Sequence, residues 1–224
     1  ADLRADVATR FVIFTGAGRA FSAGADLSQR GSEQPEESQP AHEAARLAQV
    51  AAHDMVRSLQ NLEQVTIAAV NGYCLGAGLV VAMVCDFIIA ADDALFGVPE
   101  TNVGIFYTWG ASARLNRLVG PMRAKEMIMT CENVTADQAL AIGLATKVVP
   151  RENLMEAARE MVDTIAGKSP LAVRLTKKLV NAASAPGLGD VYLVEPELVE
   201  RTHLSRDPGE GAKAFRERRK PKCS

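Results

Sequence analysis

The stretch "VTIAAVNGYCLGAGLVVAMVCDFIIAAD", residues 65–92, decides the fold. Its "VTIAAV" and "FIIAA" runs are short, apolar and rich in β-branched residues, which is typical of strands buried on both faces. The intervening "LVVAMVC" follows a glycine-rich turn and is predicted to be a short buried helix. The order of strand, helix and strand indicates an α/β protein with parallel pairing.

The same alternation extends to both sides of this stretch. "RFVIFTGAG", residues 10–18, is predicted to be a buried strand, because a β-branched and aromatic run ends there at glycine. Apolar residues at helical spacing predict an amphipathic helix over residues 41–62. "GASARLNRLVG" and "PMRAKEMIMT" predict consecutive helices, the second started by Pro121. "ATKVVP" predicts one last strand.

After residue 150 the pattern becomes helical almost throughout. We therefore divide the chain into an α/β core, residues 1–150, and a helical region, residues 151–224. Helices without strands of their own must bury their apolar stripes against the core or against another subunit. Oligomerisation through the second region is our expectation.

Composition limits the classes of partner. The net charge of −2 gives no attraction to nucleic acid or to an acidic membrane surface. The cysteines show no metal-ligand spacing, and three of them lie in apolar surroundings that suit reduced thiols. No basic, apolar leader opens the sequence. We expect a cytoplasmic protein, unless a preceding segment directs it to an organelle.

The histidines indicate no metal site. His42 and His53 are predicted to lie on a polar helical face, and His203 lies in the C-terminal tail. None has a partner at metal-ligand spacing.

Two loops place small residues directly after a strand. They are "SAGAD", residues 22–26, and "LGAG", residues 75–78. Small side chains let a ligand atom approach the backbone closely, and the first N–H groups of a helix have no intrahelical partner. Two such groups pointing at one oxygen would form an oxyanion hole. The alternative is that the small residues serve tight packing alone.

Several motifs together resemble a known family. In order they are "FTGAGRAFSAGADL", "IAAVNGYCLGAG", "CDFIIAADDALFGVPETNVG", "RLVG", "GLATKVVP" and "EGAKAFRERRKPK". They resemble the crotonase family of enoyl-CoA hydratases and isomerases over residues 11–222. The resemblance implies a crotonase-like spiral of ββα turns, followed by helices that build homotrimers, often paired into hexamers. It also implies that the family's opening strand and helix are missing before "FVIFTG".

The resemblance further implies chemistry on an acyl-CoA thioester through an enolate. The thioester oxygen would be held by the N–H groups of Ala25 and Ala77, the second at a position where the family commonly has glycine. Coenzyme A is then part of the substrate, and no separate cofactor is expected. By the same resemblance, the residues that contact substrate are Ala23, Asp26, Leu27, Gly76, Trp109 and Arg218.

The acid/base group implied by the resemblance is Glu100. Hydratases of the family use two glutamates, and this chain has Val80 at the first position and Glu100 at the second. Single-glutamate relatives include double-bond isomerases, so isomerisation of an unsaturated acyl-CoA is the preferred hypothesis. The alternatives are a hydratase or hydratase-lyase for an aromatic or unusual acyl-CoA, and a non-catalytic acyl-CoA binder.

One segment departs from the family pattern. The family usually has a Pro-Gly-Ala-Gly-Gly-like turn where this chain reads "IFYTWGASARL", residues 105–115. Tyr107, Thr108 and Trp109 either line the acyl pocket or pack the start of a helix. Arg218 likewise has two interpretations, a solvated helix end or a contact to the CoA adenine or phosphates.

Overall fold

The computed structural model describes residues 3–6, 8–25, 39–184, 195–196, 199, 207–220 and 222. The described strands form two four-stranded sheets. The first has the parallel order β1-β3-β5-β8. Its strands are β1 (Phe11–Thr15), β3 (Val65–Val70), β5 (Phe87–Ala91) and β8 (Lys147–Val149).

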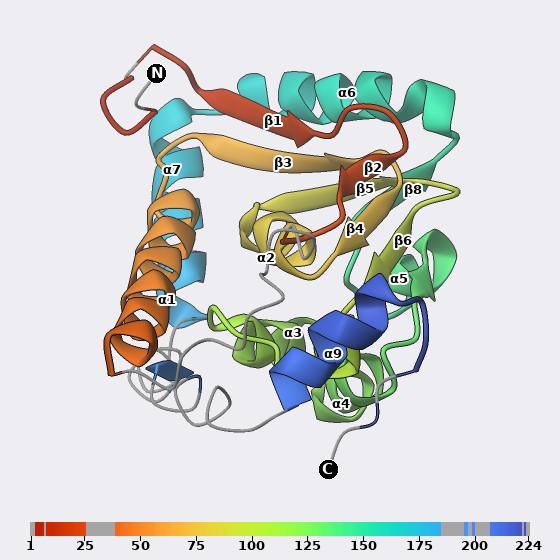
Figure 1. Ribbon diagram of the computed structural model, residues 1–224. Coiled ribbons are helices and arrows are strands. Elements are labelled where there is room, and N and C mark those ends of the chain that lie inside the picture. Colours follow the sequence, from red (N-terminus) through yellow and green to blue (C-terminus); the bar gives the residue numbers. More distant parts are fainter. Residues whose placement is uncertain are drawn as a thin grey trace.

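The second sheet has the order β2-β4-β6-β7, with the last pair antiparallel. Its strands are β2 (Ala20–Ser22), β4 (Tyr73–Leu75), β6 (Leu95–Gly97) and β7 (Val134–Thr135). Along the chain, β1 is followed by β2, β3 by β4 and β5 by β6, and the two strands of each pair belong to different sheets. The chain therefore advances in ββα turns (Figure 1). The predicted α/β spiral with parallel pairing is confirmed.

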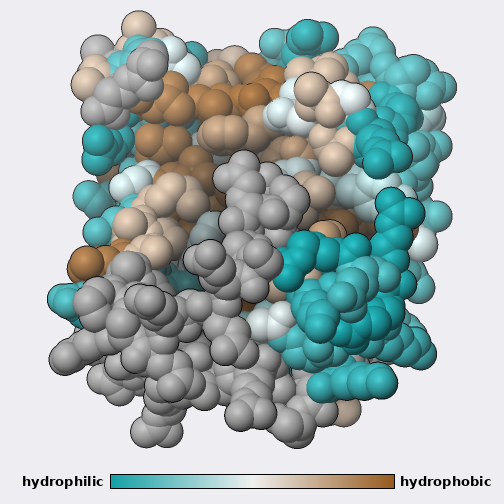
Figure 2. All heavy atoms as spheres, in the orientation of Figure 1, coloured by the Kyte–Doolittle hydropathy of each residue, from teal (hydrophilic) through white to brown (hydrophobic). Residues whose placement is uncertain are grey.

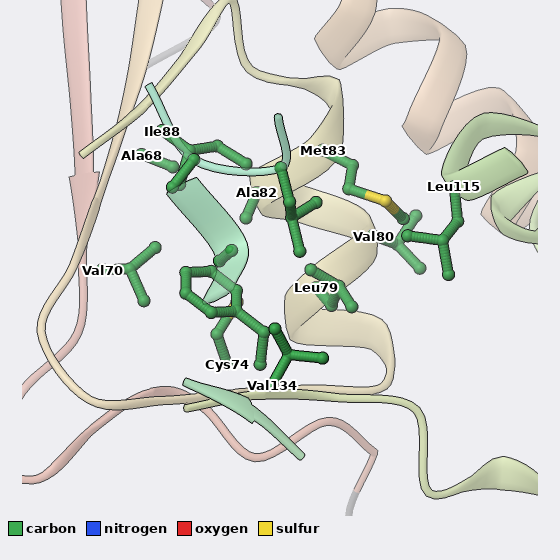
Figure 3. Packing of buried hydrophobic residues seen from close by; sticks show 14 of the residues in the cluster. Ala68, Val70, Cys74, Leu79, Val80, Ala82, Met83, Ile88, Leu115 and Val134 are labelled. Atoms are coloured by element: carbon green, nitrogen blue, oxygen red, sulfur yellow. The ribbon is translucent and has the colours of Figure 1, made fainter. Parts of the chain in front are cut away.

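The core lies between the sheets, around α2 (Ala77–Val84). This helix is apolar on every side, which only a buried helix tolerates. Figure 3 shows Val80 and Met83 of α2 beside Leu115 of α3 (Ala111–Val119), with Val70 and Cys74 among the neighbouring side chains. The decisive stretch therefore builds the centre of the molecule, as predicted.

The first strand differs from its prediction. Residues 10–18 were expected to hold a fully buried strand, but the first four residues of β1 are half-buried and Thr15 is exposed. The reason is position, because β1 lies at the edge of the first sheet as described. In Figure 2 the surface over β1 and β3 is mostly brown, whereas the surface over α9 (Asp207–Arg216) is teal.

The remaining helices begin where the local chemistry predicts. Before β3 the chain forms α1 (Gln39–Gln60), and after β6 it forms the 3-10 turn η2 (Glu100–Val103), α4 (Pro121–Thr130) and α5 (Ala136–Ala141). Pro121 occupies the first turn of α4. Thr135 and Gln138 form a capping box at the start of α5, each side chain accepting from the other's backbone N–H.

The chain forms further helices after β8. They are η3 (Arg151–Asn153), α6 (Leu154–Ala166), α7 (Pro170–Ala183) and α9. Apolar residues of α6 cover the first sheet through contacts with β3 and β5 (Figure 1). Among the described helices, none combines the length and apolar character that crossing a membrane requires. The division at residue 150 and the trimer stay predictions.

Candidate active site

The two small-residue loops meet at the carboxyl ends of β2 and β4. These strands are parallel neighbours, so their ends share one edge of the sheet. A Cβ atom built on Gly24 would lie 3.1 Å from the Leu75 carbonyl oxygen and 3.5 Å from the Ala77 nitrogen. One built on Gly78 would lie 2.6 Å from the Ser22 Cβ. Glycine at both positions therefore allows the loops to approach each other.

Two backbone N–H groups are brought together by this approach. Ala77 is the first residue of α2, so its N–H has no intrahelical acceptor. Ala25 directly follows Gly24, and both alanines line one pocket. Within the described part of the chain, neither N–H donates a hydrogen bond. The two donors predicted for an oxyanion hole thus border the same space, and that role stays a prediction.

Glu100 opens η2 and faces the same pocket. Its Oε2 atom is buried and finds no hydrogen-bond partner among the described residues. Burial raises the pKa of Glu100 from its ordinary value to about 7, against a smaller opposing effect of its own backbone N–H. A Cβ atom on Gly76 would lie 2.6 Å from the Oε1 atom, so the carboxyl group lies against the backbone just before Ala77.

The pocket has a volume of about 220 Å³ and is mainly apolar. Glu100 is the one carboxylate among its described lining residues. Val80, which the resemblance aligns with the first of the two glutamates, also lines the pocket. The residues that line it are Ala25, Ala48, Gln49, Ala77, Val80, Glu100, Ile105, Phe106, Tyr107, Thr108, Trp109 and Val199.

The atypical turn contributes directly to this pocket. Tyr107 is 1% exposed and its hydroxyl donates to the Gly76 carbonyl at 3.3 Å. Burial, with the nearby Glu100 charge, raises the pKa of Tyr107 well above its ordinary value, so the hydroxyl keeps its proton. Trp109 has a left-handed backbone, with φ of 63°, just before α3 begins. Tyr107, Thr108 and Trp109 therefore both line the pocket and form the turn that precedes the helix.

The interpretation of His53 was wrong. His53 is 4% exposed rather than on a polar face, and its Nε2 lies 2.8 Å from Oε2 of Glu195. The partner is 142 residues away along the chain, so no local pattern could indicate it. The side chain of His42 and the whole of His203 lie outside the described residues.

Gln49 was missed altogether. It lies on α1, lines the pocket, and has a buried Oε1 atom without a hydrogen-bond partner among the described residues. Buried polar atoms are almost always satisfied. A ligand or a water molecule in the pocket is therefore expected to donate to Gln49.

The other predicted contact residues are placed as follows. Ala23 is exposed and precedes Gly24 in the first loop, whereas Asp26 and Leu27 lie outside the described residues. Arg218 is exposed beyond the end of α9 and does not line the pocket. Among the described residues, no group of three or more His, Cys, Asp or Glu side chains is arranged to hold a metal ion.

Comparison with known proteins supports the resemblance. Residues 1–224 match the family described as "Enoyl-CoA hydratase/isomerase". The chain is 39% identical over 210 residues to a short-chain-enoyl-CoA hydratase from Clostridium acetobutylicum, covering 93% of this chain and 78% of that protein.

Two solved structures share the fold. An enoyl-CoA hydratase from Mycobacterium avium subsp. paratuberculosis K-10 superposes with a TM-score of 0.84 at 28% identity, over 99% of this chain and 83% of that one. A monofunctional enoyl CoA isomerase from M. smegmatis superposes with a TM-score of 0.65 at 31% identity, over 86% of this chain and 79% of that one.

Proposed function

The chain belongs to the enoyl-CoA hydratase/isomerase family, and we propose that it moves a double bond along an acyl-CoA thioester with Glu100 as its single acid/base. One observation carries this proposal. Glu100 is the one carboxylate among the described residues of a largely apolar pocket, and the buried Val80 lies in the wall where a second would be needed. Within the described lining, water addition by two carboxylates therefore lacks one of them.

The proposed reaction needs no co-reactant. Ionised Glu100 takes a proton from C2 of a 3-enoyl thioester, and the electron pair of that C–H bond forms a dienolate. The negative charge on the thioester oxygen is stabilised by the N–H groups of Ala25 and Ala77. Protonated Glu100 then returns the proton to C4, and the double bond ends between C2 and C3.

The electrostatic environment of Glu100 suits both proton transfers. A group that first accepts and then donates a proton works best when its pKa lies near the working pH. The pKa of about 7 at Glu100 meets that condition, and its cause is burial rather than a neighbouring charge.

Glu100→Gln tests this assignment. Turnover of a 3-enoyl-CoA should fall by about 10²- to 10⁴-fold, the usual contribution of a positioned acid/base group, while thioester binding persists. Steady-state kinetics and calorimetric titration measure the two quantities. Glu132→Gln, at an exposed residue between α4 and β7, is the matched control and should retain activity. Full activity in Glu100→Gln would exclude the proposed role.

A hydratase, or a hydratase-lyase for an aromatic acyl-CoA, is the second candidate. The curated relative and one structural neighbour are named hydratases, and the buried Gln49 oxygen offers an acceptor for a water molecule in the Glu100 pocket. Assays of 2-enoyl, 3-enoyl and feruloyl thioesters in ¹⁸O-labelled water separate the candidates. The isomerase moves the double bond without incorporating the label, and the hydratase incorporates it. Binding without any turnover would instead favour a non-catalytic acyl-CoA binder.

A further inference from the structure

A buried His53–Glu195 pair joins three segments beside the pocket. The two residues are 4% and 3% exposed, and His53 Nε2 lies 2.8 Å from Glu195 Oε2. The backbone N–H of Gly110, which precedes α3, donates to both carboxylate oxygens of Glu195, at 3.0 and 2.8 Å. A carboxylate removed from water is stabilised by such donors, and by the N-terminal end of a helix. Glu195 thereby connects α1 to the start of α3.

The two segments that hold this pair also reach the pocket. Residues four positions apart lie on one face of a helix. On α1, Gln49 precedes His53 by four positions, and Val199 follows Glu195 by four in a stretch whose described residues are helical. Gln49 and Val199 both line the pocket. The contact between His53 and Glu195 therefore lies four positions along the chain from two lining residues, Gln49 and Val199.

The turn that Gly110 belongs to needs support from outside. Trp109 and Gly110 have φ angles of 63° and 70°. A bulky residue such as tryptophan adopts left-handed backbone at an energetic cost. A local hydrogen bond from Ala111 N–H to the Thr108 carbonyl closes the turn at 3.0 Å, but does not tie it to the rest of the protein. The two hydrogen bonds from Gly110 to Glu195 do so.

We propose that Glu195, held by His53, is a positioning residue that sets the spacing between Trp109 and α1 and so decides how bulky an acyl group the pocket accepts. This rests on the proposed function, because it takes the acyl group as the occupant of the pocket. Trp109 and Val199 line the pocket together with Ala48 and Gln49 of α1. Without the Glu195 carboxylate, the turn that holds Trp109 loses its hydrogen bonds to the segment that contacts α1.

Trp109 makes the proposal measurable, because it is the single tryptophan of the chain. Its fluorescence reports the position of the turn without any assay of turnover. We expect Glu195→Ala to shift the emission to longer wavelength, as the indole becomes more exposed. Glu195→Asp restores a carboxylate one methylene shorter and should recover part of the parent spectrum. Glu156→Gln, at an exposed residue of α6, is the control and should leave the spectrum unchanged.

Binding provides the second measurement. The dissociation constants of crotonyl-CoA, cinnamoyl-CoA and CoA itself are compared by calorimetry. In Glu195→Ala, the affinity for the bulky cinnamoyl-CoA relative to that for crotonyl-CoA should rise by about tenfold, the effect expected of a reshaped apolar pocket. The affinity for CoA, which has no acyl group, should stay within about twofold of the parent.

Two results would overturn the proposal. The first is a folded Glu195→Ala protein that keeps the parent's fluorescence emission and the parent's ratio of affinities for the two thioesters. The second is an equal loss of affinity for CoA and for both thioesters, because that loss marks a purely structural role. If Glu195→Ala does not fold, His53→Gln tests the same contact from α1 against the same two criteria. A parent protein without turnover would refute the proposed isomerase, yet the fluorescence and binding comparisons would still decide the role of Glu195.

Discussion

Gly76 carries no reacting group, yet its backbone separates the Glu100 carboxyl from Ala77. It has φ of 51°, and an added Cβ would lie 2.6 Å from Oε1 of Glu100. Gly76→Ala should therefore push the carboxylate away from the pocket. A displacement of about 1 Å costs on the order of 100-fold in rate, so we expect kcat/KM to fall by about that factor.

The control for this change is Gly18→Ala. Gly18 also has a positive φ, of 70°, but no atom lies within 4 Å of its added Cβ. Gly18→Ala should lower the free energy of unfolding by about 1–2 kcal/mol, because alanine is strained in this backbone conformation, and should keep its activity. Equal kinetic losses in both variants would mean that strain, not the displaced carboxylate, is responsible.

The pH dependence of the reaction follows from Glu100. The raised pKa of about 7 means that the carboxyl group is protonated, and inactive as a base, below that pH. We expect kcat/KM to fall by about tenfold per pH unit as the pH drops below 7, and to level off above it. A pH–rate profile from pH 5 to pH 9 measures this. A profile that stays nearly flat down to pH 5, as the ordinary pKa of 4.5 would give, would contradict it.

The residues of the site differed in how far sequence could identify them. Glu100 and Ala77 were identified through the resemblance, because each lies in a short motif, "VPET" or "LGAG", that is similar to the crotonase family. His53 and Gln49 lie on a helix whose local pattern only says that it is amphipathic. Their partners, Glu195 and the pocket, come from distant parts of the chain. Long-range contacts of this kind leave no mark in the spacing of neighbouring residues.

At the scale of elements, α9 supports η2, the short helix that carries Glu100. An added Cβ on Gly211 would overlap the Val103 backbone, so this glycine allows the two helices to touch. Gly211→Ala should force them apart and lower the free energy of unfolding by about 1–3 kcal/mol, as overpacking does. Because η2 begins at Glu100, activity should fall as well.

Gly209 provides the comparison on the same helix. No atom lies within 4 Å of a Cβ built there. Gly209→Ala should stabilise α9 by about 0.5–1 kcal/mol through helix propensity and leave activity unchanged. Chemical denaturation measures the free energy of unfolding of both variants, which should fall in Gly211→Ala and rise in Gly209→Ala. Destabilisation by both substitutions would contradict the packing argument.

Elements with strong local signals were predicted well. The apolar β3, α2 and β5 were recognisable because burial on all sides requires continuous apolar sequence. For β1, the strand was predicted correctly and its burial was not, since edge and centre strands share the same composition.

At the scale of the whole molecule, a partly buried ion pair anchors α7 to the first sheet. Lys177 Nζ lies 2.8 Å from Asp86 Oδ2 and donates to the Gln64 carbonyl at 2.7 Å. The same carboxylate oxygen accepts from the N–H and hydroxyl of Thr66, the second residue of β3. The two charged side chains are 8% and 16% exposed.

Removing the cation should weaken the whole fold. Lys177→Met leaves the partly buried Asp86 charge without its cation, and we expect a loss of about 1–3 kcal/mol in the free energy of unfolding. The adjacent Lys178 is exposed, so Lys178→Met is the matched control and should change stability by less than about 0.5 kcal/mol. Urea denaturation measures both, and equal midpoints would refute the anchoring role.

The packing of α9 and of residues 195–199 also has a consequence for protein synthesis. The described strands of both sheets end at β8, yet Val199 at the pocket, Glu195 beside it and Gly211 against Val103 come well after β8 in the sequence. A nascent chain that has emerged as far as residue 190 can have its described strands but not its full pocket lining. Activity is therefore expected only after residue 211 has emerged, rather than when the strands fold.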